Sequence, residues 1–294
     1  MNEPSLSRWS AFPAPGSGPE GGNPAGVVLD ASALDDAQML GIAAQLGYAE
    51  SAFVTAPPDA APGEALRATV RYFSPVAEVP FCGHATVATA VALTEIYGSG
   101  RYVFETRAGS VELTTEQRDG VVTASFTSVD PQVSALPEAQ LADILDLLGL
   151  DESELDPRFP SRVSFAGNPH PMIVLGRQDT FDSFSFDPDA VRQLMDSNGW
   201  TGTITVLHSL QDPDNQPLVW EARNLFPVGT LSEDPATGSA AASTGAYLRA
   251  LGVLSTPTEL TIHQGRHIGR PSLLRVSVPP AGGITVTGTA HRID

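Results

Sequence analysis

The sequence contains little cysteine and little positive charge. Cys82 is the only cysteine among 294 residues, so no disulfide can form within the chain. The chain has 16 Lys plus Arg against 34 Asp plus Glu, which gives a formal net charge of −18. This charge opposes binding to the phosphates of nucleic acids and to anionic membranes, so we expect neither as a partner.

Long apolar runs are also lacking. No segment reaches the roughly 18 consecutive apolar residues that span a bilayer, and the opening MNEPSLSRWSAFPAPG lacks the basic and then apolar pattern of a signal peptide. We therefore expect a cytoplasmic protein, and a single cysteine also suits a reducing compartment. With 41% hydrophobic and 17% charged residues, the chain is typical of a folded globular protein and long enough for two lobes.

The second half of the chain repeats two segments of the first half in the same order, about half the chain later. Two such repeats predict a duplicated α/β lobe. Counted from the Pro-Val dipeptide that both copies of the longer segment contain, Cys82 aligns with Asp234. The counterparts are GNPAGVVL (22–29) with GNPHPMIVL (167–175), and RYFSPVAEVPFCGHATVATAVAL (71–93) with RNLFPVGTLSEDPATGSAAASTGAYL (223–248).

Strand and helix patterns occur in both halves. Alternating apolar and polar residues indicate strands, whereas 33–47, 137–150 and 187–199 have the apolar spacing of helices, the first with Gly47 as its stop. The Ala-rich stretches of the repeat fit a helix inside a closing sheet, where only small side chains have room. The expected strands are 27–29, 51–55, 66–73, 110–114, 121–126, 171–175, 203–207, 218–226, 259–264, 273–278 and 284–289.

These patterns predict an α+β fold of two similar lobes, a pseudo-twofold duplication in which each lobe is a curved sheet or barrel wrapped around a central helix. We place the N-terminal lobe at residues 1–125 and the C-terminal lobe at residues 126–280. The C-terminal strand, about 280–294, is a candidate to complete the N-terminal lobe.

Two motifs that suggest a cofactor or a metal fail on their context. GSGPEG (16–21) matches the dinucleotide fingerprint, but no strand precedes it and no helix follows it. His263 and His267 stand four residues apart, as zinc ligands on a helix do, yet ELTIHQ alternates like a strand and Gly265 breaks helical geometry. We therefore expect no cofactor and no metal. G-x-S-x-G is also absent, so we expect no serine triad.

The repeated segments each contain a strand, a glycine-containing turn and a helix. Such a junction offers free backbone N–H groups and the positive end of the helix dipole, which bind a carboxylate. Two junctions facing each other would hold a small anionic substrate between the lobes. The alternative is that Gly83 and Gly238 only allow the helix and the sheet to pack closely.

Glu50 is a further candidate because YAESAFV places its charge among apolar residues at the start of a strand. In a closed cleft, desolvation would raise the pKa of this carboxyl group toward neutrality, as a proton shuttle requires. The alternative is an exposed position at the edge of a sheet.

Five motifs together resemble the phenazine-biosynthesis PhzF-like family over nearly the whole chain. The resemblance implies the fold of diaminopimelate epimerase, with two lobes, each a sheet around a central helix, and the active site between them. It also implies an isomerase that shifts a proton and a double bond on a small carboxylated substrate, works without a cofactor and forms a homodimer. The motifs are GNPAGVVLD, YAESAFV, YFSPVAEVPFCGHAT, SEDPATGSA and HQGRHIGRPS.

The resemblance also implies roles for individual residues. Glu50 matches the catalytic glutamate of the family, and His84 and Asp234 match the histidine and aspartate that flank the substrate. One departure is Ala49, where the family often has a serine that helps to hold the substrate. The predicted substrate-binding residues are Asn23, Cys82, Gly83, Gly238 and Ser239.

Cys82 leaves two alternatives open. A racemase that uses two thiols is excluded because the chain has one cysteine. Cys82 is then either a small buried residue lining the cleft or a reactive thiol activated by a helix N-terminus. A one-base epimerase using Cys82 and Asp234 therefore remains an alternative to the isomerase, as does a protein that binds a small acid without catalysis.

Overall fold

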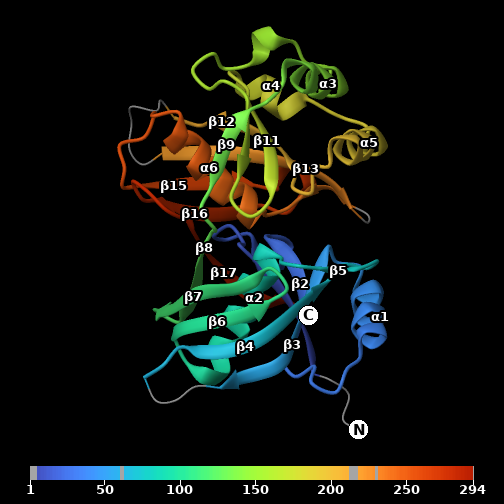
Figure 1. Cartoon of the computed structure of the whole chain (residues 1–294), viewed down its shortest axis with the longest axis vertical. Helices are drawn as coiled ribbons and strands as arrows, with labels where there is room; N and C mark the ends of the chain where they lie inside the picture. Colours follow the sequence, from blue (N-terminus) through green and yellow to red (C-terminus); the bar gives the residue numbers. More distant parts are fainter. Residues whose placement is uncertain (1–4, 60–62, 212–217, 229–230, 294) are drawn as a thin grey trace. The chain divides into compact units, whose positions relative to one another are not determined.

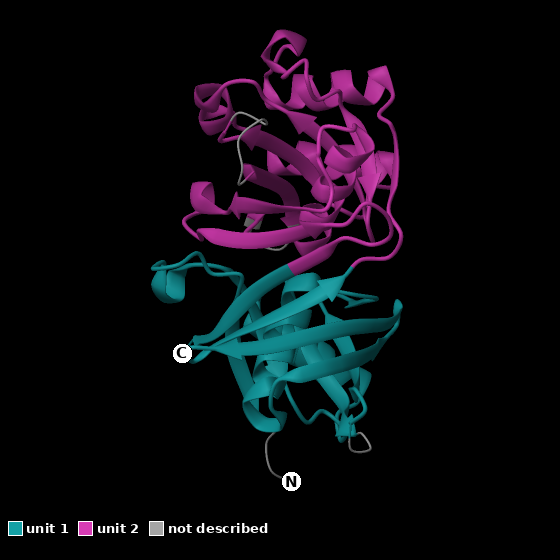
Figure 2. Cartoon of the chain, turned by 90° about the vertical axis from the view of Figure 1, so that its left-hand side faces the viewer, with its two compact units in different colours: residues 1–127, 287–294 teal, residues 128–286 magenta. Residues whose placement is uncertain are grey.

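The chain folds into two compact units, as the computed structural model shows (Figures 1 and 2). The structure describes residues 5–59, 63–211, 218–228 and 231–293. Unit 1 comprises residues 1–127 together with 287–294, and unit 2 comprises residues 128–286. The C-terminal segment thus returns to the unit in which the chain begins. Among the described residues, no helix is long and apolar enough to cross a membrane.

Unit 1 is an eight-strand barrel. Its strands pair in the closed order β1, β2, β3, β4, β6, β7, β8, β17 and back to β1, and β5 adds a short edge to β4. The pairs β2–β3 and β4–β6 are parallel. The strands are β1 (Leu6–Ala11), β2 (Asn23–Val28), β3 (Glu50–Asp59), β4 (Leu66–Phe73), β5 (Glu78–Val79), β6 (Gly100–Thr106), β7 (Gly109–Arg118), β8 (Val121–Thr127) and β17 (Thr285–Ile293).

Helix α2 (Gly83–Tyr97) fills the barrel of unit 1 and packs against β1, β2, β3, β7 and β8. Every residue from His84 to Thr94 is buried, so the small side chains are what the enclosed position requires. The hydroxyls of Thr86, Thr89 and Thr94 each donate to the carbonyl four residues earlier. These bonds satisfy polar groups that burial would otherwise leave without partners.

Two other helical elements of unit 1 lie outside the barrel core. Helix α1 (Asp36–Leu46) begins with a capping box between Asp35 and Gln38 and ends at Gly47 in the left-handed conformation, as its sequence predicts. The GSGPEG segment contains only a short 3-10 turn, η1 (Gly18–Glu20), so it has no dinucleotide-binding context.

Unit 2 repeats this architecture around helix α6 (Gly238–Ala250), which packs against β9, β10, β11 and β16. Its strands pair in the order β9, β10, β11, β12, β13, β15, β16, with β14 on β13. The parallel pairs are β11–β12 and β13–β15. The strands are β9 (Gln132–Ala135), β10 (Arg162–Phe165), β11 (Pro169–Val174), β12 (Ile204–Ser209), β13 (Leu218–Val228), β14 (Leu231–Asp234), β15 (Thr258–Gln264) and β16 (Ser272–Val278).

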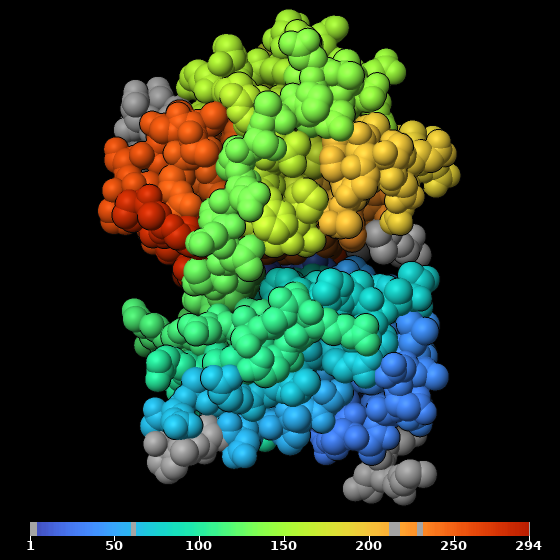
Figure 3. Space-filling model, in the orientation of Figure 1, coloured from blue at the N-terminus to red at the C-terminus, as the bar shows by residue number. Residues whose placement is uncertain are grey.

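Further helices lie on the outside of unit 2, as Figure 3 shows for α3 in green and α5 in gold. Helix α5 ends at Gly199 and α3 at Gly149, both in the left-handed conformation. The apolar faces of these helices pack on a core that includes Ile144, Val191 and Ile204. The elements are α3 (Glu138–Leu148), η2 (Glu152–Glu154), α4 (Gln178–Ser183), α5 (Pro188–Asn198) and η3 (Arg266–Ile268).

The strands of unit 2 follow the pairing order of unit 1, with β9 in the place of β17 and β14 in the place of β5, which confirms the predicted α+β duplication. One detail of the predicted alignment is wrong. Tyr72 on β4 pairs with Val79, whereas its counterpart Asn224 on β13 pairs with Asp234. Asp234 therefore corresponds to Val79 and not to Cys82, because the β13–β14 connection is longer and contains an irregular register. The counterpart of Cys82 is Thr237, since these two residues are the N-caps of α2 and α6.

Candidate active site

Four predicted site residues meet at one end of the barrel of unit 1. Asn23 and Glu50 are the first residues of β2 and β3, which are neighbouring parallel strands. Cys82 is the N-cap of α2, and His84 is the second residue of that helix. Two strand starts and one helix start therefore bring an amide, a carboxylate, a thiol and an imidazole together.

The side chains of this cluster are in direct contact. The Cys82 thiol lies 3.5 Å from Glu50 Oε2, to which it donates, and 3.3 Å from His84 Nδ1. His84 Nε2 lies 3.8 Å from Glu50 Oε2, and the Asn23 amide nitrogen lies 3.1 Å from His84 Nδ1. Glu50 is therefore neither at an exposed edge nor fully enclosed, since 14% of its side chain is exposed.

Burial determines the charge of His84. Desolvation lowers the pKa of His84 to about 3, and a hydrogen bond to the backbone of Pro24 opposes this shift only in part. The imidazole is thus neutral at pH 7, and its approach to Glu50 is not an ion pair. Because the adjacent thiol is not a cation either, neither neighbour fixes the Glu50 carboxylate in a salt bridge, which leaves it suited to accept a proton.

Cys82 is 7% exposed and contacts both Glu50 and His84. It is therefore buried, as the sequence suggests, but it also lies against the candidate base. The start of a helix lowers the pKa of a thiol, whereas burial raises it. The geometry keeps both readings of this residue open to experiment.

Asp234 belongs to a second cluster, in unit 2, at the start of α6. The Thr237 hydroxyl donates to Asp234 Oδ2 over 2.6 Å, and the Gln264 amide donates to the Asp234 carbonyl over 2.6 Å. Gln264 also accepts from the Thr237 backbone N–H over 3.2 Å. These bonds hold Asp234 in place. The sequence analysis predicted neither Thr237 nor Gln264 as a site residue.

Ser239, the second residue of α6, is oriented by the buried His170 on β11. The Thr203 backbone N–H donates to His170 Nδ1 over 3.0 Å, and an amide N–H can only donate. His170 Nδ1 also lies 3.2 Å from the Thr203 carbonyl and 3.0 Å from the Thr203 hydroxyl, and Nε2 lies 3.0 Å from Ser239 Oγ. The ring therefore fixes the position of the Ser239 hydroxyl at the start of α6.

His170 is a functional candidate that the sequence analysis missed, although it lies in the repeated segment GNPHPMIVL. Burial lowers the pKa of His170 to about 4, so the ring is neutral. Gly202 leaves room for the ring, because a Cβ there would lie 2.8 Å from His170 Cε1. The nearby Thr203 hydroxyl donates to Asn224 Oδ1 over 2.7 Å and belongs to the same buried network.

Gly83 and Gly238 are the first residues of α2 and α6. Both helices therefore begin where the repeated motifs place them. The first-turn N–H groups of a helix have no intrahelical partner and favour anions. The pair His263 and His267 does not form a helical zinc motif, since β15 contains the first and η3 the second, where His267 Nε2 lies 3.0 Å from Asp182.

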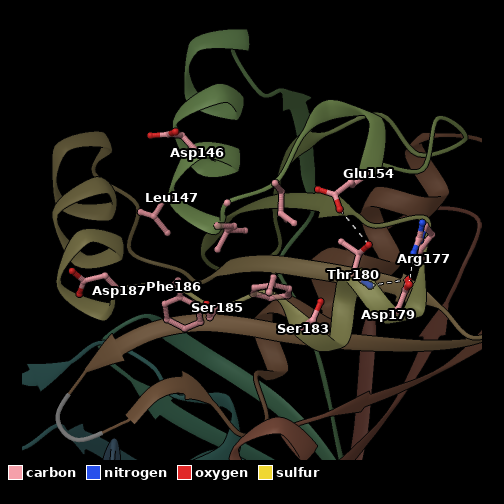
Figure 4. A pocket seen from close by; sticks show the side chains of 14 residues that line it. Asp146, Leu147, Glu154, Arg177, Asp179, Thr180, Ser183, Ser185, Phe186 and Asp187 are labelled. Atoms are coloured by element: carbon pink, nitrogen blue, oxygen red, sulfur yellow. Dashed lines mark hydrogen bonds and ion pairs between the residues drawn. The ribbon is translucent and has the colours of Figure 1, made fainter.

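Unit 2 also contains an open groove of about 780 Å³ between α3, α4 and the start of α5 (Figure 4). In Figure 4, Arg177 faces Asp179, and Glu154 points toward Thr180. Four carboxylates and one guanidinium line this groove, so its charge repels a carboxylate substrate. None of the predicted site residues lines it.

The chain contains no lysine, since all its 16 basic residues are arginine. No side-chain amine is available for a Schiff base with a carbonyl group. The chemistry of the clusters therefore depends on carboxylate, thiol, imidazole, hydroxyl and backbone groups.

The chain is similar to proteins of one family over nearly its whole length. The family model described as "Phenazine biosynthesis-like protein" matches residues 12–293. The "Uncharacterized isomerase YddE" of Escherichia coli (strain K12) is 31% identical over 279 residues, which are 92% of this chain and 90% of that protein. The "Trans-2,3-dihydro-3-hydroxyanthranilate isomerase" of Pseudomonas fluorescens is 32% identical over 254 residues, which are 86% of this chain and 84% of that protein.

The fold comparison gives the same family. The crystal structure of the Bacillus anthracis phenazine biosynthesis protein of the PhzF family has a TM-score of 0.80 and 24% sequence identity, and the match covers 100% of this chain and 98% of that one. The names of the relatives confirm the predicted enzyme class, an isomerase. The family model and these relatives therefore show that the chain, which has the fold of the solved PhzF-family structure, belongs to the phenazine biosynthesis-like, or PhzF, family.

Proposed function

We propose that this isomerase moves a proton, and with it a double bond, within a small substrate that carries a carboxylate. Glu50 is the general base and acid, His84 and Asp234 flank the substrate, and Asn23, Cys82, Gly83, Gly238 and Ser239 bind it. The observation that carries the proposal is the partly exposed Glu50 carboxylate, held beside a neutral imidazole and a thiol at 3.8 Å and 3.5 Å.

The proposed reaction leaves the substrate formula unchanged. Glu50 takes a proton from one carbon, and the electron pair of that C–H bond delocalises into the neighbouring double bond. The carboxylic acid so formed exchanges its hydrogen with solvent and gives a proton to another carbon, which regenerates the carboxylate. Neither electrons nor groups are lost, so the step needs no oxidant and no co-substrate.

His84 and Asn23 support this step through polar contacts rather than charge. A neutral imidazole offers one donor and one acceptor, and the Asn23 amide at 3.1 Å fixes the orientation of the ring. A positively charged histidine would instead pair with Glu50 and lower its basicity. The burial of His84 is thus consistent with a base that must accept a proton near neutral pH.

In unit 2, Ser239 and the start of α6 are proposed to bind the carboxylate of the same substrate. His170 Nε2 lies 3.0 Å from the Ser239 hydroxyl and holds it in this position. Together with the N–H groups of the first helical turn, this hydroxyl makes an anion site. Asp234, held by Thr237 and Gln264, is proposed to accept from a donor group elsewhere on the substrate.

Solvent exchange tests the proposal directly. A panel of small unsaturated carboxylic acids, beginning with the trans-2,3-dihydro-3-hydroxyanthranilate in the name of a relative, is incubated with the enzyme in deuterium oxide and analysed by mass spectrometry. The wild type is expected to place deuterium in at least one acid. Glu50→Gln is expected to lose exchange with an unchanged circular dichroism spectrum. Equal exchange in both proteins would remove Glu50 from the mechanism.

The contact between Cys82 and Glu50 favours one alternative, a one-base epimerase that uses Cys82 and Asp234. Cys82→Ala distinguishes the two reactions. It is expected to retain exchange if Glu50 is the base and to lose it if the thiol is. A protein that binds a small acid without any exchange would instead match the non-catalytic alternative.

A further inference from the structure

The Glu50 cluster contains a donor set for a metal ion. Among the residues that the structure describes, Glu50, Cys82 and His84 form the one group of three metal-ligating side chains whose ligand atoms all lie within 4.8 Å of one another. A carboxylate oxygen, a thiolate sulfur and an imidazole nitrogen are the three kinds of ligand that proteins use for zinc.

The spacing of these atoms matches a tetrahedral ion. Zinc bonds of about 2.3 Å to sulfur and about 2.0–2.2 Å to nitrogen and oxygen place neighbouring donors roughly 3.3–3.6 Å apart. Glu50 Oε2 and Cys82 Sγ are 3.5 Å apart, and His84 Nε2 lies 3.8 Å from each of them. Cys82 Sγ also lies 3.3 Å from His84 Nδ1, so the imidazole must turn to direct Nε2 at an ion held by Glu50 Oε2 and Cys82 Sγ.

The surroundings support binding as well. Cys82 and His84 are 7% and 4% exposed, so two of the three ligands are already held by burial. The Asn23 amide nitrogen lies 3.1 Å from the other ring nitrogen of His84, and a turn of this amide would present its Oδ1 as the acceptor that orients a metal-bound histidine. A second acidic group, Asp182 with Glu221 and His267, differs because Arg266 already lies against both carboxylates and supplies the positive charge.

We propose that Glu50, Cys82 and His84 bind one thiophilic divalent cation such as Zn²⁺, and that the bound ion inhibits the enzyme reversibly. Binding breaks the S–H bond of Cys82, releases its proton to solvent and forms a metal–sulfur bond. The carboxylate and the thiolate then neutralise the two charges of the ion. The inhibition rests on the proposed function, because the ion occupies the oxygen with which Glu50 accepts a proton.

Cobalt binding tests the site without any measurement of activity. The protein is treated with a chelator and titrated with Co²⁺, whose visible spectrum reports tetrahedral geometry and whose near-ultraviolet charge-transfer band reports a thiolate ligand. The wild type is expected to bind one equivalent with both signals. Cys82→Ser and His84→Asn are expected to weaken binding more than about 100-fold, beyond the roughly 10- to 100-fold loss expected for the outer partner in Asn23→Ala.

His263→Asn is the matched control, since this histidine lies in unit 2 on β15 and outside the cluster. It is expected to bind cobalt as the wild type does. Absence of the thiolate band in the wild type, or its persistence in Cys82→Ser, would overturn the proposal. Circular dichroism identifies a variant that fails to fold, and the wild-type titration and Asn23→Ala still decide the question in that case.

Inhibition is measured separately. Zn²⁺ is expected to abolish solvent exchange at one equivalent, and excess chelator is expected to restore it. Cobalt binding without any exchange activity would leave the site standing and overturn the proposed function. Exchange that continues in the metal-loaded protein would overturn the inhibition alone.

Discussion

The two units share a scaffold but place different chemistry on it. In unit 1, β2 provides an amide, Asn23, to the second residue of the helix, His84. In unit 2, β11 provides a histidine, His170, to the second residue of the helix, Ser239. Both contacts join the strand to the second helical residue, but they start two positions apart on the strand, because His170 corresponds to Ala25.

The residue at the start of β3 also differs from the corresponding residue next to β12. Val27 pairs with Ala52 and its counterpart Met172 pairs with Thr205, so two residues earlier Glu50 corresponds to Thr203. Unit 1 thus has a carboxylate where unit 2 has a hydroxyl. This difference matches the proposed roles, which are proton transfer in unit 1 and anion binding in unit 2.

The largest difference that we expect between β11 and its counterpart β2 is a loss of folding stability in acid. His170 is buried with its pKa lowered to about 4, whereas its counterpart Ala25 does not titrate. In the unfolded chain this histidine binds a proton below about pH 6.5. In the folded chain it binds a proton only near pH 4. The contribution of His170 to the free energy of unfolding is therefore complete above about pH 6.5 and is lost as the pH falls toward 4. The loss is about 1.4 kcal/mol per pH unit and on the order of 3 kcal/mol in total.

Urea unfolding at several pH values measures this effect. The free energy of unfolding of His170→Gln is expected to fall less steeply than that of the wild type between pH 6 and pH 4.5, roughly. The groups around the ring, Ser239, Thr203 and Asn224, are neutral and do not add to the difference. Parallel curves for the two proteins would contradict the neutral buried histidine.

Removal of the Ser239 hydroxyl tests the anion-binding role of unit 2. A hydrogen bond to a charged group contributes about 1.5–3 kcal/mol, so Ser239→Ala is expected to raise KM about 10- to 100-fold and to change kcat little. Ser243→Ala is the matched control on the same helix, because its buried hydroxyl has no hydrogen-bond partner within the part of the chain that the structure describes. Equal KM values for the wild type and Ser239→Ala would remove this residue from substrate binding.

The helix cores give the smallest expected effect. Gly245 of α6 corresponds to Ala90 of α2, and a Cβ at Gly245 would lie 2.9 Å from Val278 Cγ2. Gly245→Ala is expected to lower the free energy of unfolding by about 1 kcal/mol. Overpacking costs about 1–3 kcal/mol, and the higher helix propensity of alanine offsets about 1 kcal/mol of this cost.

The reverse change, Ala90→Gly, is also expected to cost about 1 kcal/mol through lost helix propensity. Urea unfolding of both variants provides the comparison. A gain in stability for Gly245→Ala would mean that the sheet of unit 2 relaxes around this helix as easily as that of unit 1 accepts alanine.

The sequence predicted the fold well because the signals that determine it are local. Alternating apolar and polar residues indicate the strands, and Ala-rich stretches indicate the central helices. The repeated GNP and glycine-turn segments indicate the duplication. The alignment of Cys82 with Asp234 was wrong by three residues, since sequence counting does not show that the β13–β14 connection is longer.

The site was predicted in part. Glu50, Cys82 and His84 were identified from motifs, and the structure brings them into contact. His170 and Gln264 were missed because their roles depend on partners 69 and 30 residues away. Such contacts follow from strand pairing across the sheet, and no local pattern in the sequence indicates them.

The central claim is that unit 1 transfers the proton through Glu50 and unit 2 binds the substrate carboxylate through Ser239. The most direct test is the initial rate of deuterium incorporation into the substrate, measured by NMR at saturating substrate for Glu50→Gln and Ser239→Ala side by side. Glu50→Gln is expected to lose about 100- to 10,000-fold in this rate, the range for a general base, while Ser239→Ala keeps a rate near that of the wild type. Exchange that persists in Glu50→Gln, or that disappears in Ser239→Ala despite saturation, would contradict the account.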